Sequence, residues 1–214
     1  MTMDLMGPSL ADLYQFCGYR FSLKTTLMLA VQLIDRFKYM HEKEFIHRDV
    51  KPANFVRKDK DSTSFCVIDF GLTRQYLEKN GSIIPKRENV EFRGTTMYAS
   101  PRTLNKEEQC PRDDLYGMIL VLCDFICGSL PWAVASRDKD KPEVARLKHQ
   151  YLDDPNNLIN YVKSTAQAEA RARSDKDLLR SSEVQGKWPF GPEYDPFPQR
   201  ARTAMLDILH YLTD

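Results

Sequence analysis

The chain has 214 residues, and its 31 lysines and arginines nearly balance its 30 aspartates and glutamates. This length fits one globular domain with a buried core, and the charge balance gives no reason to expect a nucleic acid or an anionic membrane as partner. The five cysteines lack zinc-type spacing, and the apolar run 118–127 is too short to cross a bilayer.

Two capped helices are predicted in the first part of the chain, after a short extended apolar stretch at residues 1–6. Ser9 is placed to cap a brief helix that ends near Phe16, because a hydroxyl can bond a free amide of the first turn. Ser22 is placed in the same way before a longer helix. Its apolar residues recur at helical spacing, which predicts a buried face: Leu23, Leu27, Ala30, Val31, Ile34 and Phe37.

Short strands and a long loop are predicted next. Residues 54–56 and 65–68 favour two strands joined by the polar turn 58–64. Residues 70–101 have no apolar period, which is typical of a long functional loop. The most apolar helix is predicted at 114–127, and we expect it at the centre of the core.

Two motifs lie beside the predicted strand pair. Residues 47–54 have the pattern H-R-D-x-x-x-x-N, and residues 69–71 are D-F-G. One such residue alone would more often be a polar residue of a turn, but the whole set in register argues against that reading. Both motifs belong to the protein-kinase signature set, as its catalytic loop and its metal-binding loop. The sequence therefore resembles a eukaryotic protein kinase catalytic domain.

This resemblance implies a chemical role for five residues. Asp49 would accept or orient the proton of an attacking hydroxyl, and Lys51 would steady the γ-phosphate. Asn54 and Asp69 would hold Mg²⁺, which prefers oxygen ligands. Thr95 would approach Asp49 and Lys51, as in serine/threonine kinases, although a loop hydroxyl with no such role is the alternative.

Three further residues are expected to support this site. Asp114 would accept hydrogen bonds from backbone amides of the catalytic loop. Arg48 would organise the loop without touching substrate, and His47 would be a packed core histidine.

The resemblance also implies ATP as a cofactor beside Mg²⁺. Met3 would lie at the back of the adenine pocket, with backbone groups of Asp4 and Met6 on the adenine edge. Asp12 would reach the ribose. The residues at the floor of the pocket would be Val56 and Ile68. The alternative, that residues 3–6 form only a frayed terminus, stays open.

A narrower resemblance covers residues 1–153 and resumes near residue 196. Residues 7–13, 93–100, 112–115 and 128–132 are similar to segments of the casein kinase 1 group. Residues 92–95 and the Lys-Asp-Lys run after Trp132 are similar to its tau-tubulin kinase branch. This implies a kinase that acts on serine or threonine of proteins in the cytoplasm or nucleus, and it leaves the oligomeric state open.

The expected fold class is α+β, a mainly α-helical kinase C-terminal lobe with short β-hairpins at the cleft and no β-rich N-terminal lobe. The chain contains no G-x-G-x-x-G and no V-A-I-K, the motifs that the other lobe supplies. We expect a hinge at 1–8 and the core of the lobe, with catalytic and activation loops, at 9–135. A charged helix and insertion are expected at 136–187, and a terminal helix at 188–214.

Two functions from different classes are open. The first is an ATP-dependent serine/threonine kinase, present as a chain without its N-terminal lobe and expected to show little or no turnover alone. The second is a catalytically inactive half-kinase that binds proteins. It predicts an exposed apolar cleft, formed by Met3, Leu5, Met6, Val56 and Ile68. The intact set of Asp49, Asn54 and Asp69 favours the first.

Overall fold

The structure is a computed structural model that describes residues 4–59, 63–87, 90–154, 156–165 and 168. Its regular structure is mainly helical, and its strands form two small sheets, so the predicted α+β class is confirmed. The predictions for Met3 and for the terminal helix at 188–214 lie outside the described residues, as does most of the predicted insertion.

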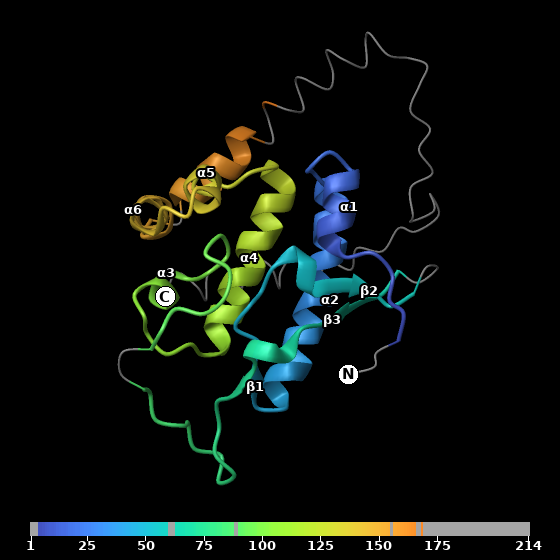
Figure 1. The fold of residues 1–214 in the computed structure, drawn as a ribbon. Coiled ribbons are helices and arrows are strands. Elements are labelled where there is room, and N and C mark those ends of the chain that lie inside the picture. Colours follow the sequence, from blue (N-terminus) through green and yellow to red (C-terminus); the bar gives the residue numbers. More distant parts are fainter. Residues whose placement is uncertain (1–3, 60–62, 88–89, 155, 166–167, 169–214) are drawn as a thin grey trace.

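Helices surround a central pair in the described part of the chain (Figure 1). They are α1 (Leu10–Phe16), α2 (Leu23–Glu42), α3 (Pro101–Leu104), α4 (Pro111–Cys127), α5 (Ala133–Arg137) and α6 (Lys141–Leu152). The strands are β1 (Phe45–Ile46), β2 (Phe55–Arg57), β3 (Phe65–Val67) and β4 (Arg74–Gln75), and 3-10 turns lie at Pro52–Asn54 and Phe70–Leu72. Residues 156–165 are also helical.

The predicted helix starts are confirmed at α1 and α2. The Ser9 hydroxyl accepts a hydrogen bond from the Asp12 amide at 3.1 Å, and the Asp12 carboxylate accepts one from the Ser9 amide at 2.9 Å. Together they form a capping box. Ser22 accepts a hydrogen bond from the Thr25 amide at 3.1 Å. The start of α4 was predicted too late, because Pro111 suits the first helical position, where its missing N–H costs nothing.

Helices α2 and α4 run side by side through the centre of the molecule (Figure 1). Both contribute to one buried cluster, which includes Leu29, Leu33 and Phe37 from α2 and Met118, Val121 and Phe125 from α4. Each such side chain stabilises the fold by about 1.5–3 kcal/mol when fully buried. The buried face predicted for α2 is confirmed at Ala30 and Phe37 but is wrong at Leu23 and Val31, which are 59% and 38% exposed. A second cluster joins α4 to α5 and α6 around Leu120, Trp132 and Val144. The central place predicted for α4 is confirmed.

Two antiparallel strand pairs position the loops between these helices. In the first, β2 pairs with β3, with Val56 opposite Cys66. The chain before α1 lies along the free edge of β2, because the Gly7 amide donates to Arg57 O at 2.8 Å and the Arg57 amide to Pro8 O at 3.0 Å. In the second pair, β1 lies beside β4.

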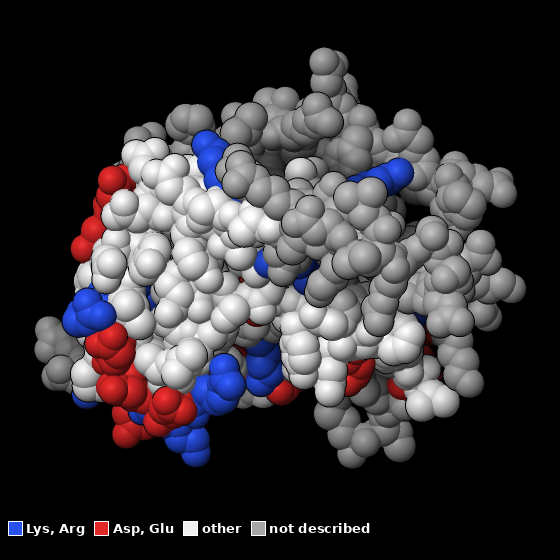
Figure 2. Space-filling view, turned by 90° about the horizontal axis from the view of Figure 1, so that it is seen from above, with Lys and Arg blue, Asp and Glu red and all other residues white. Residues whose placement is uncertain are grey.

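The described surface carries charges of both signs. Figure 2 shows acidic and basic side chains gathered together along one side of the face seen from above, while the rest of its described surface is mostly uncharged. This mixture agrees with a net charge near zero. Within the described residues, no helix combines the length and the apolar character needed to cross a membrane.

A buried network ties α1 and residue 98 to α4 through Asp124, which is 4% exposed. The Tyr98 hydroxyl donates to Asp124 Oδ2 at 2.8 Å, and the Tyr14 hydroxyl donates to the Asp124 backbone oxygen at 2.7 Å. Burial raises the pKa of Asp124 to about 6, although the hydrogen bond from Tyr98 acts in the opposite direction. The ionised form is therefore costly at neutral pH.

Asp124→Asn is predicted to remove a pH dependence of stability. The pKa of this carboxyl rises from 3.8 to about 6 on folding. Its contribution to the stability of the fold is therefore complete below the pKa of the unfolded state and is lost as the pH rises through the pKa of the folded state. The loss at neutral pH is about 3 kcal/mol. Urea unfolding should therefore show Asp124→Asn gaining stability relative to wild type as the pH rises from about 4 to about 6, with a nearly constant difference at higher pH.

The exposed Asp138→Asn is the control for that measurement. Its difference from wild type should stay nearly constant over the same range. A constant difference for Asp124→Asn as well would show that Asp124 does not ionise at a cost.

Candidate active site

Residues 47–54 form the loop between β1 and β2, and this loop brings its polar side chains together around Asp49. Lys51 Nζ donates to Asp49 Oδ2 at 2.5 Å, and Asn54 Nδ2 donates to the Asp49 backbone oxygen at 2.8 Å. From the loop at 70–101, Thr95 Oγ1 donates to Asp49 Oδ1 at 2.8 Å. Thr95 thus lies next to Asp49, where the sequence predicted it.

The charge of Asp49 is stabilised by these partners. Burial raises the pKa of Asp49, but the hydrogen bonds from Lys51 and Thr95 outweigh it, so the pKa lies below its ordinary value. Asp49 is therefore ionised at neutral pH while only 7% exposed. A carboxylate with a lowered pKa is a weak base, so it is better suited to orient an incoming hydroxyl than to hold its proton.

Asp114 of α4 holds the loop at 47–54 in place. Its carboxylate accepts hydrogen bonds from the backbone amides of His47 and Arg48, both at 2.8 Å, and lies 3.0 Å from His41 Nε2. Arg48 has φ +70°, a left-handed conformation that costs about 1–2 kcal/mol for a residue with a side chain. The two hydrogen bonds from backbone amides offset this cost, so Asp114 has the contacts expected of a supporting residue.

The other expected supports are also present. His47 is buried, and its Nε2 lies 3.1 Å from the Ile68 backbone oxygen. Arg48 Nε donates to the Leu72 backbone oxygen at 2.5 Å. Both contacts join the H-R-D loop to the D-F-G loop.

Asn54 and Asp69 lie at the same end of the β2–β3 hairpin, because the Ile68 amide donates to the Asn54 backbone oxygen at 2.9 Å. Asn54 is buried and Asp69 is exposed. Since Asn54 Nδ2 bonds Asp49, the side-chain oxygen of Asn54 is the atom left for a cation. No described residues form a group of three side chains that could hold a metal alone. Two oxygen ligands fit Mg²⁺, which binds through one or two protein groups together with substrate phosphates.

The residues predicted to contact a nucleotide are only partly brought together. Val56 is buried in β2, and Ile68 follows β3 on the same hairpin. Asp4 is exposed, and Met6 precedes the segment that is bonded to β2. The Asp12 carboxylate is engaged with the Ser9 amide and hydroxyl, at 2.9 and 2.7 Å, and thus serves the cap of α1. Met3 lies outside the described residues.

The sequence reasoning missed an ion-pair cluster beside this loop. Glu108 lies between two arginines: Arg87 Nε is 2.7 Å and Arg74 Nη1 2.8 Å from Glu108 Oε2. The Arg74 contact is an ion pair without hydrogen-bond alignment. The hydrogen bond from Arg87 holds the pKa of Glu108 below its ordinary value. Burial lowers the pKa of the neighbouring Arg48, and the charges of Arg87 and Arg74 lower it further.

Gly94 allows the loop at 70–101 to touch the catalytic loop. It has φ +109°, and a Cβ at this position would lie 2.6 Å from the Arg48 backbone oxygen. That distance is shorter than any real Cβ contact, so the two loops meet only because residue 94 has no side chain.

Gly94→Ala is predicted to separate the two loops, whereas Gly18→Ala is the matched control. Gly18 also has a positive φ, +71°, but a Cβ there would meet nothing within 4 Å. Both variants incur backbone strain of about 1–2 kcal/mol, and only Gly94→Ala adds a steric clash. Urea unfolding should give a loss for Gly94→Ala that exceeds the loss for Gly18→Ala by at least about 1 kcal/mol. Equal losses would mean that the space beside Arg48 is not limiting.

One comparison with known proteins bears on this site. The family model described as protein kinase domain matches residues 1–182. The match spans the catalytic loop, both strand pairs, the loop at 70–101 and helices α1 to α6.

Proposed function

Because the chain belongs to the protein kinase family, we propose that it transfers the γ-phosphate of ATP to serine and threonine hydroxyls of proteins. Protein kinases are transferases that generally use ATP and Mg²⁺ and act on protein substrates. The observation that carries the proposal is the ionised Asp49 carboxylate, held at once by Lys51 and Thr95.

In the proposed mechanism, the chain positions groups and neutralises charge, which is the main demand of phosphoryl transfer. Asp49 orients the acceptor hydroxyl, and Lys51 places a positive charge beside the incoming phosphate. The oxygens of Asn54 and Asp69 would hold Mg²⁺, which would neutralise phosphate charge when bound. Asp114 keeps this loop in its strained conformation through hydrogen bonds from two backbone amides.

Serine and threonine are proposed as acceptors because of Thr95. Its hydroxyl joins Asp49, whose other carboxylate oxygen bonds Lys51, the arrangement that the sequence predicted for a serine/threonine kinase. We also propose membership of the casein kinase 1 group, tau-tubulin kinase branch, supported by residues 93–100 and 128–132. With this branch we propose protein substrates in the cytoplasm or nucleus, and neither nucleic acid nor membrane as partner.

The proposed division of the chain follows the expectation of a hinge at 1–8 and a lobe core at 9–135. It is supported by the hydrogen bonds of Gly7 and Pro8 to Arg57, which seat this segment on the β2–β3 hairpin. Residues 136–187 remain proposed as a charged helix and an insertion, and residues 188–214 as the terminal helix of the lobe.

The alternative of a protein-binding module without transfer is not favoured. Its expected exposed apolar cleft is present only in part, since Leu5 is 91% exposed whereas Val56 is buried. The polar groups that only chemistry requires are assembled around Asp49.

The proposal predicts that the purified chain labels serine and threonine peptides, but not tyrosine peptides, with the γ-phosphate of ATP in the presence of Mg²⁺. Turnover is expected to be slow, because the chain has no G-x-G-x-x-G or V-A-I-K to position the triphosphate. Asp49→Asn should lower the rate about 10²–10⁴-fold, since it removes the group that orients the hydroxyl. A radiometric assay of initial rates measures both effects.

Asp69→Asn should abolish the Mg²⁺-dependent rate, and the exposed Asp138→Asn should keep it. Labelling that persists in Asp49→Asn would refute the assigned role, and labelled tyrosine would refute the acceptor class. A wild-type chain that labels nothing would favour the binding module.

A further inference from the structure

A lysine is buried in a place where the proposed chemistry does not need one. Lys148 of α6 is 0% exposed, which is rare for lysine. Its Nζ donates to the backbone oxygens of Thr96, at 2.8 Å, and Ala99, at 2.5 Å. Burial lowers the pKa of Lys148 well below its ordinary value. An apolar side chain would fill the same space without that cost, so the donors themselves matter.

Trp132, at the start of α5, completes this contact. Its ring lies 5.2 Å from Lys148 Nζ, in a cation–π arrangement. Its Nε1 donates to the Met97 backbone oxygen at 2.8 Å. Two buried side chains therefore bind three of the four carbonyls from Thr96 to Ala99.

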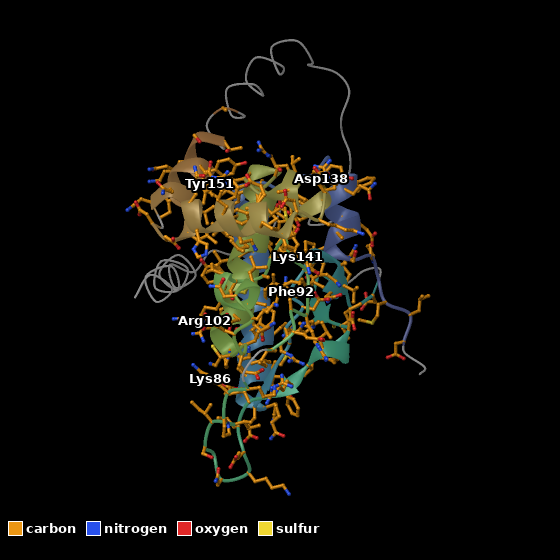
Figure 3. All side chains as sticks on the ribbon, turned by 60° about the vertical axis from the view of Figure 1, so that its left-hand side comes forward. Lys86, Phe92, Arg102, Asp138, Lys141 and Tyr151 are labelled. Atoms are coloured by element: carbon orange, nitrogen blue, oxygen red, sulfur yellow. The ribbon has the colours of Figure 1, made fainter. Side chains whose placement is uncertain are left out.

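Helix α6 meets the same segment a second time. Lys141 lies seven residues before Lys148 and hence on the same face of the helix. Its Nζ lies 5.1 Å from the centre of the Phe92 ring, and Figure 3 shows these two labelled side chains close together. Helix α6 thus runs along the chain from Phe92 to Ala99. It makes an exposed contact through Lys141 at one end and a buried contact through Lys148 at the other.

The bound carbonyls follow directly after Thr95. The amides of Tyr98 and Ala99 both donate to the Thr95 backbone oxygen at 3.1 Å, so a shift of residues 96–99 moves Thr95 as well. The Thr95 hydroxyl bonds Asp49. Asp49, Thr95, Tyr98 and Ala99 line the same pocket, so a hydroxyl that enters this pocket lies beside the segment.

We propose that Lys148 and Trp132 form a carbonyl clamp that positions residues 95–99 for the docking of protein substrates beside Asp49. This inference rests on the proposed function and deepens it. Both are positioning residues, because they bind the segment and not the reacting groups.

Hydrogen exchange tests the clamp without any need for activity. Lys148→Met keeps the length of the side chain and removes the donors, which leaves two buried carbonyls unbonded. The Tyr98 and Ala99 amides should then exchange about tenfold faster or more, while the amides of α2 keep their protection. Lys163→Met, at an exposed position of the helix 156–165, is the matched control and should change neither.

Trp132→Phe gives a second and milder variant. It keeps an aromatic ring and removes the N–H that binds Met97, so the same two amides should exchange a few-fold faster. If Lys148→Met unfolds the whole molecule, the result for Trp132→Phe decides. Unchanged exchange at Tyr98 and Ala99, or an equal rise in α2, would overturn the clamp.

Kinetics separate the positioning role from a merely structural one. Both variants should raise the KM for a protein substrate about tenfold and leave hydrolysis of ATP without that substrate unchanged. An unchanged KM would overturn the link to docking. A wild-type chain without transfer would refute the proposed function instead, and the exchange experiment would still decide whether the clamp exists.

Discussion

The buried carboxylate of Asp114 is the interaction on which the site depends. It is 1% exposed and binds two successive amides of a loop whose residue Arg48 is left-handed. Asp114 belongs to α4, the helix that shares the central core with α2, so this carboxylate links the core to the loop beside Val50, the loop residue that packs in the core itself. The packing of the apolar core thus determines where Asp49 lies, although no apolar residue of that core forms a polar contact with Asp49.

The loop at 70–101 needs anchors of another kind, because its described residues have little regular structure to satisfy their own backbone. Side chains from distant elements serve that need. Asp49 and Asp124 accept hydrogen bonds from hydroxyls of this loop. Lys148 and Trp132 donate hydrogen bonds to its carbonyls, and Glu108 forms ion pairs with its arginines. An irregular segment can therefore hold one conformation when polar groups of the surrounding helices replace the partners that a helix or sheet would provide.

These two kinds of interaction explain how far the sequence could lead. The caps at Ser9 and Ser22, the β2–β3 hairpin and the central helix depend on neighbours a few residues away, and local pattern predicted them. The chemical motif also predicted the meeting of Thr95 with Asp49. The pairs Glu108–Arg87 and Lys148–Thr96 left no such signal, because the two partners lie 21 and 52 residues apart in the chain. Glutamate and lysine are also solvated far more often than buried.

Asp49 and Asp124 show how burial and the hydrogen-bond partner together set the pKa of a carboxylate. Their exposed fractions are close, 7% and 4%, yet the pKa of Asp49 lies below its ordinary value and that of Asp124 rises to about 6. Asp49 has a lysine ammonium beside it, while the hydrogen bond to the Asp124 carboxylate comes from a neutral hydroxyl. A cation compensates the buried charge directly, whereas a hydroxyl offers only a dipole. The charge at Asp49 is therefore available for chemistry at neutral pH, and the charge at Asp124 reduces the stability of the fold.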